Sequence, residues 1–452
     1  MAAAATTTTT QPPPPPHFLA GKKIIVAGCG MAGLSFAIAL RRLWDSAPPS
    51  AGSAPELLLL DRDGRRIGPA REGYSLSLHG ADADGGLIAC RDLGLLDEML
   101  ARAVAGDGAA GDGAGGFRIW DASAWRELLR VNAAPHAGLP TAVIRITRRD
   151  VRDVLIEGVE RTDAIRWHRT CTAAERLPNG MIRVHISPSP SAGAGDGHPE
   201  PPTTEDCHLL IAADGAHSKL RASLRPGRDA LLRYAGAVQL GGVGRFPGGL
   251  PPPLDRDWGM VLTGEGAACF FSPVDKTGVV WALSRLEPES ARPVAYDRTS
   301  ATAFAALKDE ALALGRSIAE PFPSVVRATE QDTSFVLPAR DLEPFGHIDA
   351  DGSLPLPGVV FLGDSNHAVS PFAGNGANLA LKDGWDLASR LCAAGSLDEA
   401  VTAYDALALP RARRTLKTSR DRIAMGHWTG WRYWRFRIVL WFGTWFMWLA
   451  GR

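Results

Sequence analysis

Short apolar runs and longer Ala/Leu-rich stretches alternate along the chain, and this alternation predicts an α/β fold. Near the start, the β-branched run from Ile24 to Val26 predicts a buried parallel strand. The stretch that follows it, as far as about Trp44, predicts a helix, and Leu57 to Leu60 predict the next strand. Strands that alternate with helices in this way are typical of a parallel sheet covered by helices.

A glycine-rich loop joins the first predicted strand to its helix, with the pattern Gly28-x-Gly30-x-x-Gly33. The first glycine allows a tight turn, the second lets backbone N–H groups approach a pyrophosphate, and the third lets helix and strand pack closely. Asp61 directly follows the second strand, where a carboxylate can accept both hydroxyls of an adenosine ribose. This order predicts a dinucleotide site, and the alternative is a glycine turn in another α/β fold.

Three later segments carry further motifs in a fixed order. They read Ile146-Thr-Arg148-Arg-Asp-Val151-Arg-Asp-Val-Leu155, then Leu209-Leu-Ile-Ala-Ala-Asp214-Gly215-Ala-His-Ser218-Lys-Leu-Arg221, then Val359-Val-Phe-Leu-Gly363-Asp364-Ser-Asn-His367-Ala-Val-Ser-Pro371-Phe-Ala-Gly374-Asn375-Gly376-Ala-Asn378. Together with the glycine loop, they resemble the para-hydroxybenzoate-hydroxylase-like, FAD-dependent aromatic-ring monooxygenases. The resemblance is nearest to the tetracycline-inactivating and salicylate-hydroxylase-like members that act as a single component. The first segment looks like the family's Arg-bearing helix, and the other two resemble its Asp-Gly and Gly-Asp fingerprints.

The resemblance implies an α/β fold: a Rossmann-type FAD-binding domain with an inserted mixed β-sheet substrate domain and a C-terminal helical tail. It implies that Asp364 bonds a ribityl hydroxyl and that the helix opened by the last glycines faces the pyrimidine side of the flavin. Asn375 stands where the family most often has Gln. Arg148 could instead belong to a solvated helix face, and Asp214 could be a plain strand-to-turn residue. The implied cofactor-binding residues are Gly28, Gly30, Gly33, Asp61, Arg62, Arg71, Arg148, Asp214, Gly215, Asp364, Pro371, Gly374, Asn375, Gly376 and Asn378.

The segment from Arg71 to Gly80 resembles a stretch that runs beside the flavin ring in the tetracycline-inactivating members. By this alignment Arg62 flanks the adenosine ribose, and Arg71 or His79 approaches the isoalloxazine. These two residues are the candidates for a catalytic role, although a structural role for His79 fits the sequence equally well.

The implied chemistry is centred on the flavin, so few side chains need to be catalytic. NAD(P)H reduces FAD, reduced FAD captures O2, and a C4a-hydroperoxide transfers one oxygen atom to an aromatic or polyketide-like molecule. Hydroxylation, epoxidation and Baeyer–Villiger insertion all fit this route. Two alternatives are an FAD-dependent dehydrogenase or halogenase on the same scaffold, and a non-redox FAD-fold protein that binds a partner.

The composition changes sharply at several points and predicts how the chain is divided. Phe270, Phe271, Trp281, Phe335 and Pro338 are candidates for the substrate pocket wall or for plain core. The predicted parts are a disordered tail (1–18), the first part of the FAD-binding domain (19–230) with loops at 105–116 and 188–204, a substrate-binding sheet (231–345), the last part of the FAD-binding domain (346–425) and a Trp-rich C-terminal helix (426–452).

Charge and cysteine usage exclude some classes of partner. The 49 basic residues balance 49 acidic ones, so the chain lacks the basic field that a nucleic-acid partner normally needs. The six scattered cysteines form no Cys-x-x-Cys pair, which predicts no structural metal and an intracellular protein, cytoplasmic or peripherally attached to a membrane. The sequence leaves the oligomeric state open.

Six of the thirteen tryptophans lie between Trp428 and Trp448. Their spacing predicts a helical face, and arginines flank the uncharged run from Ile438 to Ala450. This run is shorter than the ~20 residues needed to span a bilayer. The tail therefore predicts either an amphipathic helix at a membrane interface or a helix packed on the catalytic domain or a subunit interface.

Overall fold

The computed structural model describes residues 15–106, 116–131, 133–136, 138–189, 201–227, 231–289, 296–349 and 352–449, with only the backbone for 441–449. Most of the predicted tail and the centres of both predicted loops lie outside the described residues. His17 and Phe18, which the prediction placed in the tail, pack on the protein; the His17 ring lies 5.2 Å from the Trp44 ring. The packed chain therefore begins before the predicted boundary, because both rings find an apolar surface on the first helix.

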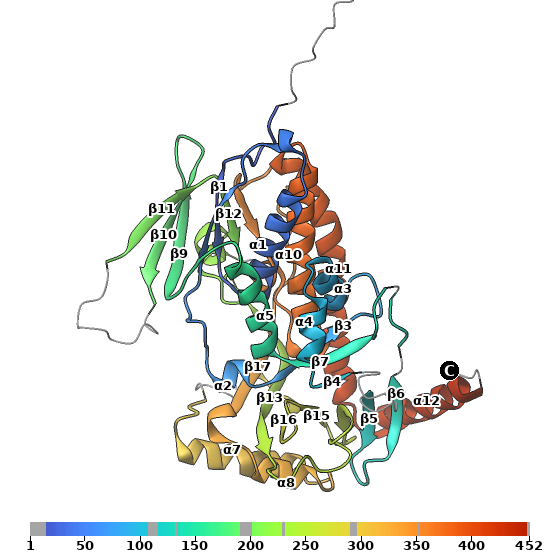
Figure 1. The fold of residues 1–452 in the computed structure, drawn as a ribbon. Coiled ribbons are helices and arrows are strands. Elements are labelled where there is room, and N and C mark those ends of the chain that lie inside the picture. Colours follow the sequence, from blue (N-terminus) through green and yellow to red (C-terminus); the bar gives the residue numbers. More distant parts are fainter. Residues whose placement is uncertain are drawn as a thin grey trace, which may run out of the picture.

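A parallel five-stranded sheet forms the centre of the upper lobe, in the order β18–β12–β1–β2–β8 (Figure 1). Strand β1 pairs in parallel with β2 and β12, and its residues Ile24 to Val26 are fully buried. The strands predicted at 24–26 and 57–60 are thus confirmed to within a residue. The bounds are β1 (Lys23–Ala27), β2 (Glu56–Leu60), β8 (Ile165–Arg166), β12 (Leu209–Ala212) and β18 (Val359–Phe361).

Helices cover this sheet and pack closely on one another (Figure 1). Gly384 lies against the first helix so tightly that a Cβ would stand 2.6 Å from the Phe36 nitrogen. The larger helices are α1 (Met31–Asp45), α5 (Arg148–Glu160), α10 (Gly376–Ala393) and α11 (Leu397–Gly426). The shorter ones are α2 (Pro69–Glu72), α3 (Gly86–Asp92), α4 (Leu96–Ala101), α6 (Lys219–Leu224) and α9 (Asp364–His367).

Two three-stranded sheets flank the central one. The order β11–β10–β9 forms an outer sheet, and β3–β7–β4 connects the two lobes (Figure 1). Both predicted loops are bounded by strands, because β4 covers 105–106, β10 reaches Pro188 and β11 starts at Thr203. The bounds are β3 (Ser75–His79), β4 (Ala105–Gly106), β7 (Val143–Thr147), β9 (Arg169–Arg176), β10 (Ile182–Pro188) and β11 (Thr203–Cys207).

The lower lobe is built on a seven-stranded sheet in the order β17–β13–β16–β15–β14–β5–β6. Helices α7 (Ala301–Leu314) and α8 (Phe322–Arg327) cover one face, where Phe322 packs against Phe271 and Trp281. Two strands come from residues 117–131, which the sequence division had assigned to the first part of the FAD-binding domain. The bounds are β5 (Phe117–Asp121), β6 (Glu127–Val131), β13 (Arg233–Arg245), β14 (Trp258–Leu262), β15 (Ala267–Pro273), β16 (Gly278–Leu286) and β17 (Phe335–Asp341).

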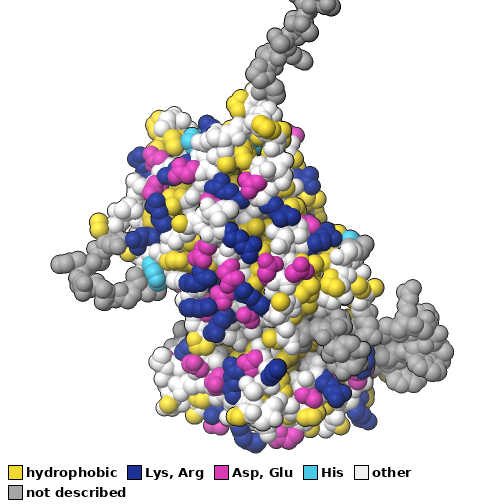
Figure 2. All heavy atoms as spheres, in the orientation of Figure 1, with side chains coloured by type: hydrophobic (Ala, Val, Ile, Leu, Met, Phe, Trp, Pro, Cys, Tyr) yellow, Lys and Arg dark blue, Asp and Glu magenta, His cyan; other side chains and the backbone are white. Residues whose placement is uncertain are grey.

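The last helix, α12 (Gly430–Leu449), leads away from α11 and lies beside β6 (Figure 1). Among the described residues, none of the helices is long and apolar enough to cross a membrane. On the face of the molecule in Figure 2, acidic and basic side chains are interspersed, as the balanced composition predicts.

Candidate functional site

The turn between β1 and α1 is closed by glycines that no other residue could replace without strain. Gly28 has a φ of +104°, and a Cβ there would stand 2.3 Å from the Ala213 carbonyl oxygen. A Cβ on Gly33 would stand 2.1 Å from the Gly28 carbonyl oxygen. The first and third glycines of the motif therefore serve the packing of the loop itself, as the sequence predicted.

Gly30 is different, because a Cβ there would meet no atom of the protein within 4 Å. It caps α1 at its N-terminus, where no side chain supplies a capping hydrogen bond and the first turn carries no acidic residue. Unpaired N–H groups and the helix dipole make such a position favourable for an anion. A pyrophosphate fits this open, uncapped backbone, and the geometry is compatible with FAD.

Asp61 anchors this loop from the second strand. Its Oδ2 accepts a hydrogen bond of 2.7 Å from the Cys29 backbone, and its Oδ1 accepts one of 2.8 Å from the Asp63 backbone. Burial raises the pKa of Asp61, and these two N–H donors oppose the shift. Each carboxylate oxygen keeps a second lone pair, so the side chain can hold the loop and still accept from a ribose.

A cavity of about 60 Å³ lies between the glycine loop, the end of β2 and the start of α5. Arg71 reaches it and pairs with Asp63 at 2.9 Å, while Arg62 pairs with the same carboxylate at 3.4 Å. The structure thus brings Arg71 to the glycine-loop end of the site. The cavity is lined by Cys29, Gly30, Met31, Asp61, Asp63, Ile67, Arg71, Arg148 and Arg152.

Arg148 is the first residue of α5 and also lines this cavity. Its Nη1 donates to the Tyr74 hydroxyl at 2.7 Å, and the Tyr74 oxygen, followed by Asp364, raises its pKa. The predicted helix began at Ile146, which is wrong: Ile146 lies in β7, and Thr147 caps the helix by accepting from the Asp150 backbone. The β-branched residues before Arg148 favour the strand, and the threonine begins the helix.

The neighbouring arginines give a direct test of this placement. We expect Arg148→Gln to weaken FAD binding about 10- to 150-fold, because a hydrogen bond to a charged group contributes roughly 1.5–3 kcal/mol. Arg149→Gln is the control, since the Arg149 side chain is half exposed and, among the described residues, forms an ion pair only with Glu72, at 3.7 Å. Titration of each apoprotein with FAD measures both affinities. Equal losses in the two variants would contradict a direct role for Arg148.

The Asp-Gly motif follows β12 as predicted. Asp214 Oδ2 accepts from the Leu220 backbone at 3.1 Å, so this carboxylate begins the turn into α6. Burial raises its pKa. Gly215 has a φ of +83° and faces open space. These contacts fit the strand-to-turn alternative for Asp214, and its contact with a cofactor stays a prediction.

The Gly-Asp motif forms a solvent-accessible strip at the end of β18. Gly363 has a φ of +64°, and the Asp364, Pro371 and Gly374 residues after it are exposed. Burial nevertheless raises the pKa of Asp364, with His367 and Arg148 opposing. The contact of Asp364 with a ribityl chain stays a prediction.

Asn378 makes three hydrogen bonds within the protein, and its contact with a cofactor stays a prediction. Its Oδ1 accepts from the backbones of His79 and Gly86 at 2.8 and 2.9 Å, and its Nδ2 donates to the Ser77 carbonyl at 2.9 Å. It therefore ties α10 to β3 and α3. Asn375 caps α10, which begins at Gly376, and its amide donates to Thr415 at 3.3 Å.

His79 lies against the Gly-Asp motif, and its ring forms a hydrogen bond with the Gly374 backbone. Burial lowers its pKa, and Arg145 and Arg422 lower it further, against the hydrogen bond to Gly374. The structure brings His79 and Gly374 together but places Arg71 at the other, glycine-loop end. Their predicted approach to the isoalloxazine stays untested.

Arg145 is a buried residue of this region that the sequence analysis did not single out. Within the described chain, its guanidinium donates hydrogen bonds to neutral oxygens. These are the Ser272 hydroxyl at 2.7 Å, the Ser77 hydroxyl at 2.6 Å and the Ser75 carbonyl at 2.7 Å. Burial lowers its pKa to about 9. Its guanidinium lies 5.5 Å from the Phe270 ring, on the sheet face away from α8.

Among the five pocket candidates, Phe271 and Trp281 are core residues, whereas Phe270 and Phe335 are partly exposed and Pro338 is exposed.

Behind the Gly-Asp motif, α9, α10 and α11 share a buried ionic cluster, which we call the Asp383 cluster: His367, Asp383, Asp386 and Arg411. His367 Nε2 lies 2.7 Å from Asp383 Oδ2, although not in line for a hydrogen bond, and Arg411 Nη2 donates to Asp383 Oδ1 at 2.9 Å. Arg411 also pairs with Asp386 at 2.8 Å. The presence of His367 in the motif was the only sequence signal for this cluster.

His367 should make the stability of the protein depend on pH. Burial alone would lower its pKa, but Asp383 and then Asp364 outweigh burial and raise it above the unfolded value of about 6.5. The stabilisation is therefore complete below about pH 6.5 and is lost as the pH rises through the raised pKa. Urea unfolding at a series of pH values should show this slope, flattened in His367→Gln and retained in the exposed control His217→Gln. An unchanged slope in His367→Gln would contradict the assignment.

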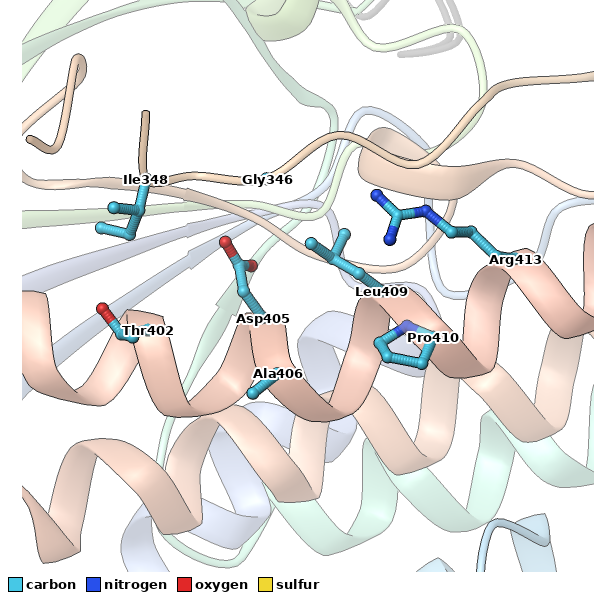
Figure 3. A pocket seen from close by; sticks show the side chains of 8 residues that line it. All are labelled: Gly346, Ile348, Thr402, Asp405, Ala406, Leu409, Pro410 and Arg413. Carbon is cyan, nitrogen blue, oxygen red and sulfur yellow. The ribbon is translucent and has the colours of Figure 1, made fainter. Parts of the chain in front are cut away.

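A larger cavity, of about 320 Å³, lies elsewhere, between α11 and the segment around Gly346 (Figure 3). Asp405 points from α11 toward this segment, where its Oδ1 and Oδ2 lie 2.7 Å from the His347 Nδ1 and backbone N (Figure 3). None of its lining residues belongs to the glycine loop or the motifs above. The smaller cavity, which the glycine loop, Asp61 and Arg148 line, is therefore the candidate functional site. Among the described residues, no group of three or more His, Cys, Asp or Glu could hold a metal ion.

Known proteins share this sequence and fold. The FAD binding domain family matches residues 357–419. The chain is 42% identical over 416 residues to the monooxygenase cfoF of Aspergillus candidus, covering 91% of this chain and 93% of that one. It is 29% identical to a 3-amino-4-hydroxybenzoate 2-monooxygenase of Streptomyces cremeus, covering 88% and 86%. Klebsiella pneumoniae HpxO, solved with FAD and uric acid, shares the fold with a TM-score of 0.69 at 21% identity, covering 94% of each chain.

Proposed function

The chain belongs to the family of FAD-dependent aromatic monooxygenases, and from this premise we propose that it uses NAD(P)H and O2 to insert one oxygen atom into an aromatic or polyketide-like small molecule. The observation that carries the proposal is the convergence of three separate motifs, through Gly30, Asp61 and Arg148, on one cavity.

The residues present fit FAD, and each would have a distinct task. Gly30 and the N-terminus of α1 would hold the pyrophosphate, and Asp61 would hold the adenosine ribose. Arg148 would add a positive charge over the same cavity, and Asp364 would accept from the ribityl chain. When bound, FAD would supply the redox chemistry: hydride uptake from NAD(P)H and oxygen transfer by the C4a-hydroperoxide route.

The protein would contribute orientation, electrostatics and exclusion of water. The N-terminus of α10 carries no acidic residue in its first turn and no side-chain cap, so its dipole can stabilise negative charge on a flavin ring. The seven-stranded sheet would cover the substrate, with Phe270 on the face beside Arg145. Burial of a guanidinium among neutral serines favours a substrate with a phenolic or carboxylate oxygen.

The names of similar proteins support a ring substrate of this kind. They include a hydroxylase of salicylate, crystallised with its substrate, and the monooxygenase of 3-amino-4-hydroxybenzoate. Both of these compounds carry a phenolic oxygen and a carboxylate on a single ring. The buried Arg145 guanidinium, which meets only neutral oxygens among the described residues, supports that choice.

The test uses the purified flavoprotein with NADPH or NADH and a panel of phenolic acids and polyketide phenols. We expect one nicotinamide to be oxidised faster when a substrate is added, and isotope-labelled O2 to place one labelled atom in the product. Rapid mixing of reduced enzyme with O2 should show a transient flavin absorbance before reoxidation. Stimulated oxidation without label in the product would favour a dehydrogenase, and chlorination of the product would favour a halogenase.

For its location, we infer a peripheral association with a membrane through residues 426–452, supported by the exposed tryptophans of that segment. This proposal is independent of the flavin site.

A further inference from the structure

The C-terminal segment has a charge composition unlike the rest of the chain. From Arg422 to Arg452 the sequence contains five arginines and no acidic residue, although the whole chain has equal numbers of basic and acidic residues. The same segment holds six of the thirteen tryptophans. Arginine and tryptophan together are typical of a surface that meets anionic headgroups and the boundary of the acyl chains.

One face of α12 fixes the helix to the protein. The Tyr433 ring is buried, and its hydroxyl donates to the Leu262 carbonyl at the end of β14, at 3.2 Å. Phe436 packs against Trp428 with 5.7 Å between ring centres, and Arg437 lies 4.0 Å from Asp121 of β5. The helix is therefore held at the β5–β14 part of the seven-stranded sheet.

The opposite face of α12 has no covering within the described chain. Trp431 is 65% exposed and Trp434 is 60% exposed, and Ile438 and Val439 are exposed to a similar degree. On a helix of 3.6 residues per turn, residues 431, 434 and 438 share one side, and Tyr433 and Phe436 lie on the other. The first half of α12 thus presents an apolar stripe outward while its inner side is occupied.

Two arginines are placed among these exposed residues. The Arg435 guanidinium lies 5.1 Å from the Trp431 ring centre, and that of Arg432 lies 5.9 Å from it. Both arginines are exposed, and no ion pair with a carboxylate is found for either among the described residues. Exposed cations beside indole rings can reach lipid phosphates while the rings enter the headgroup region.

We propose that this face, made of Trp431, Arg432, Trp434, Arg435, Ile438 and Val439, docks on an anionic lipid surface. We call it the α12 outer face. A second copy of the chain on the same face would bring Arg432 and Arg435 against the same two arginines, which like-charge repulsion disfavours. An anionic bilayer instead supplies the complementary charge and an apolar layer for the rings. Because α12 is held at β5 and β14, docking would turn the β5–β14 part of the seven-stranded sheet toward the membrane.

The experiment is co-sedimentation of the full-length flavoprotein with phosphatidylcholine vesicles, with and without phosphatidylserine. We expect binding to the vesicles that contain phosphatidylserine, weakening as salt is raised. Arg432→Gln with Arg435→Gln should weaken that binding about 30-fold, since each arginine near the surface contributes about a factor of five. Trp431→Ser with Trp434→Ser should remove the part of the binding that resists salt.

The matched control is Arg256→Gln with Arg327→Gln, which removes two exposed arginines outside α12 and should leave vesicle binding unchanged. Bound flavin and substrate-stimulated NAD(P)H oxidation should be equal in all variants, because none of these residues lies at the flavin site. Absence of binding to phosphatidylserine vesicles at low salt would overturn the proposal. A concentration-dependent dimer that the tryptophan variant abolishes would likewise overturn it, in favour of a second copy on this face.

Discussion

Gly30→Ala is expected to weaken the binding of FAD while leaving the apoprotein folded. The added Cβ would meet no protein atom within 4 Å, and the φ of −79° at Gly30 suits any residue. The change at the helix cap should alter the unfolding free energy by no more than about 1 kcal/mol. A methyl group in the space of a pyrophosphate should cost about 1–3 kcal/mol of binding, or roughly 5- to 150-fold in affinity.

The measurement compares thermal unfolding of the apoproteins with FAD titration of each. Gly28→Ala is the matched control in the same loop, because its Cβ would stand 2.3 Å from the Ala213 oxygen and its φ is +104°. That variant should lose apoprotein stability as well as FAD binding, by at least about 2 kcal/mol. Unchanged FAD affinity in Gly30→Ala would show that the pyrophosphate does not approach this glycine.

The second large effect is expected from Asp383→Asn, which should destabilise the protein by about 3–5 kcal/mol. Asp383 is fully buried and faces both His367 at 2.7 Å and Arg411 at 2.9 Å. Both cations hold the pKa of Asp383 below its usual range in spite of burial. Removing the carboxylate leaves Arg411 with Asp386 and Asp84 but takes the adjacent carboxylate from His367, and weaker compensation of buried charge is costly.

Asp421→Asn provides the comparison on the neighbouring helix. Asp421 pairs with Lys417 at 2.6 Å, but both side chains are exposed, and an exposed pair contributes at most about 1 kcal/mol. Urea unfolding of the two variants and of the unchanged chain measures the difference. Equal stability losses for Asp383→Asn and Asp421→Asn would contradict the role of the Asp383 cluster.

Local sequence patterns determined those parts of the protein that depend on residues close together in the chain. The glycine loop could be predicted because Gly28, Gly30 and Gly33 perform their tasks within one turn between a strand and a helix. The buried strands could be predicted because a parallel strand covered on both faces needs a continuous apolar run. The Asp-Gly and Gly-Asp motifs then carried the identification of the cofactor, because they resemble the fingerprints of a known FAD-dependent family.

Tertiary structure decided the features that join distant segments. Asn378 belongs to the Gly-Asp motif, but its side-chain amide forms hydrogen bonds with the backbone of β3, about 300 residues away in the chain. Arg71 turns to Asp63 rather than to the region of His79. The seven-stranded sheet takes two strands from residues 117–131, because β5 pairs with β14. None of these partners can be read from local spacing, because each depends on how separate elements pack.

The same distinction separates the two sides of the C-terminal helix. Composition and tryptophan spacing predicted a Trp- and Arg-rich helix over residues 426–452 and left two environments open, whereas the structure has α12 over Gly430–Leu449. Only the packing of Tyr433 on Leu262 decided which side is occupied, and it left Trp431 and Trp434 exposed. The sequence by itself thus determined the cofactor motifs and the elements that carry them, because those are local. The structure decided which side chains meet across the fold, since burial and charge pairing depend on neighbours that the chain brings together only when it is folded.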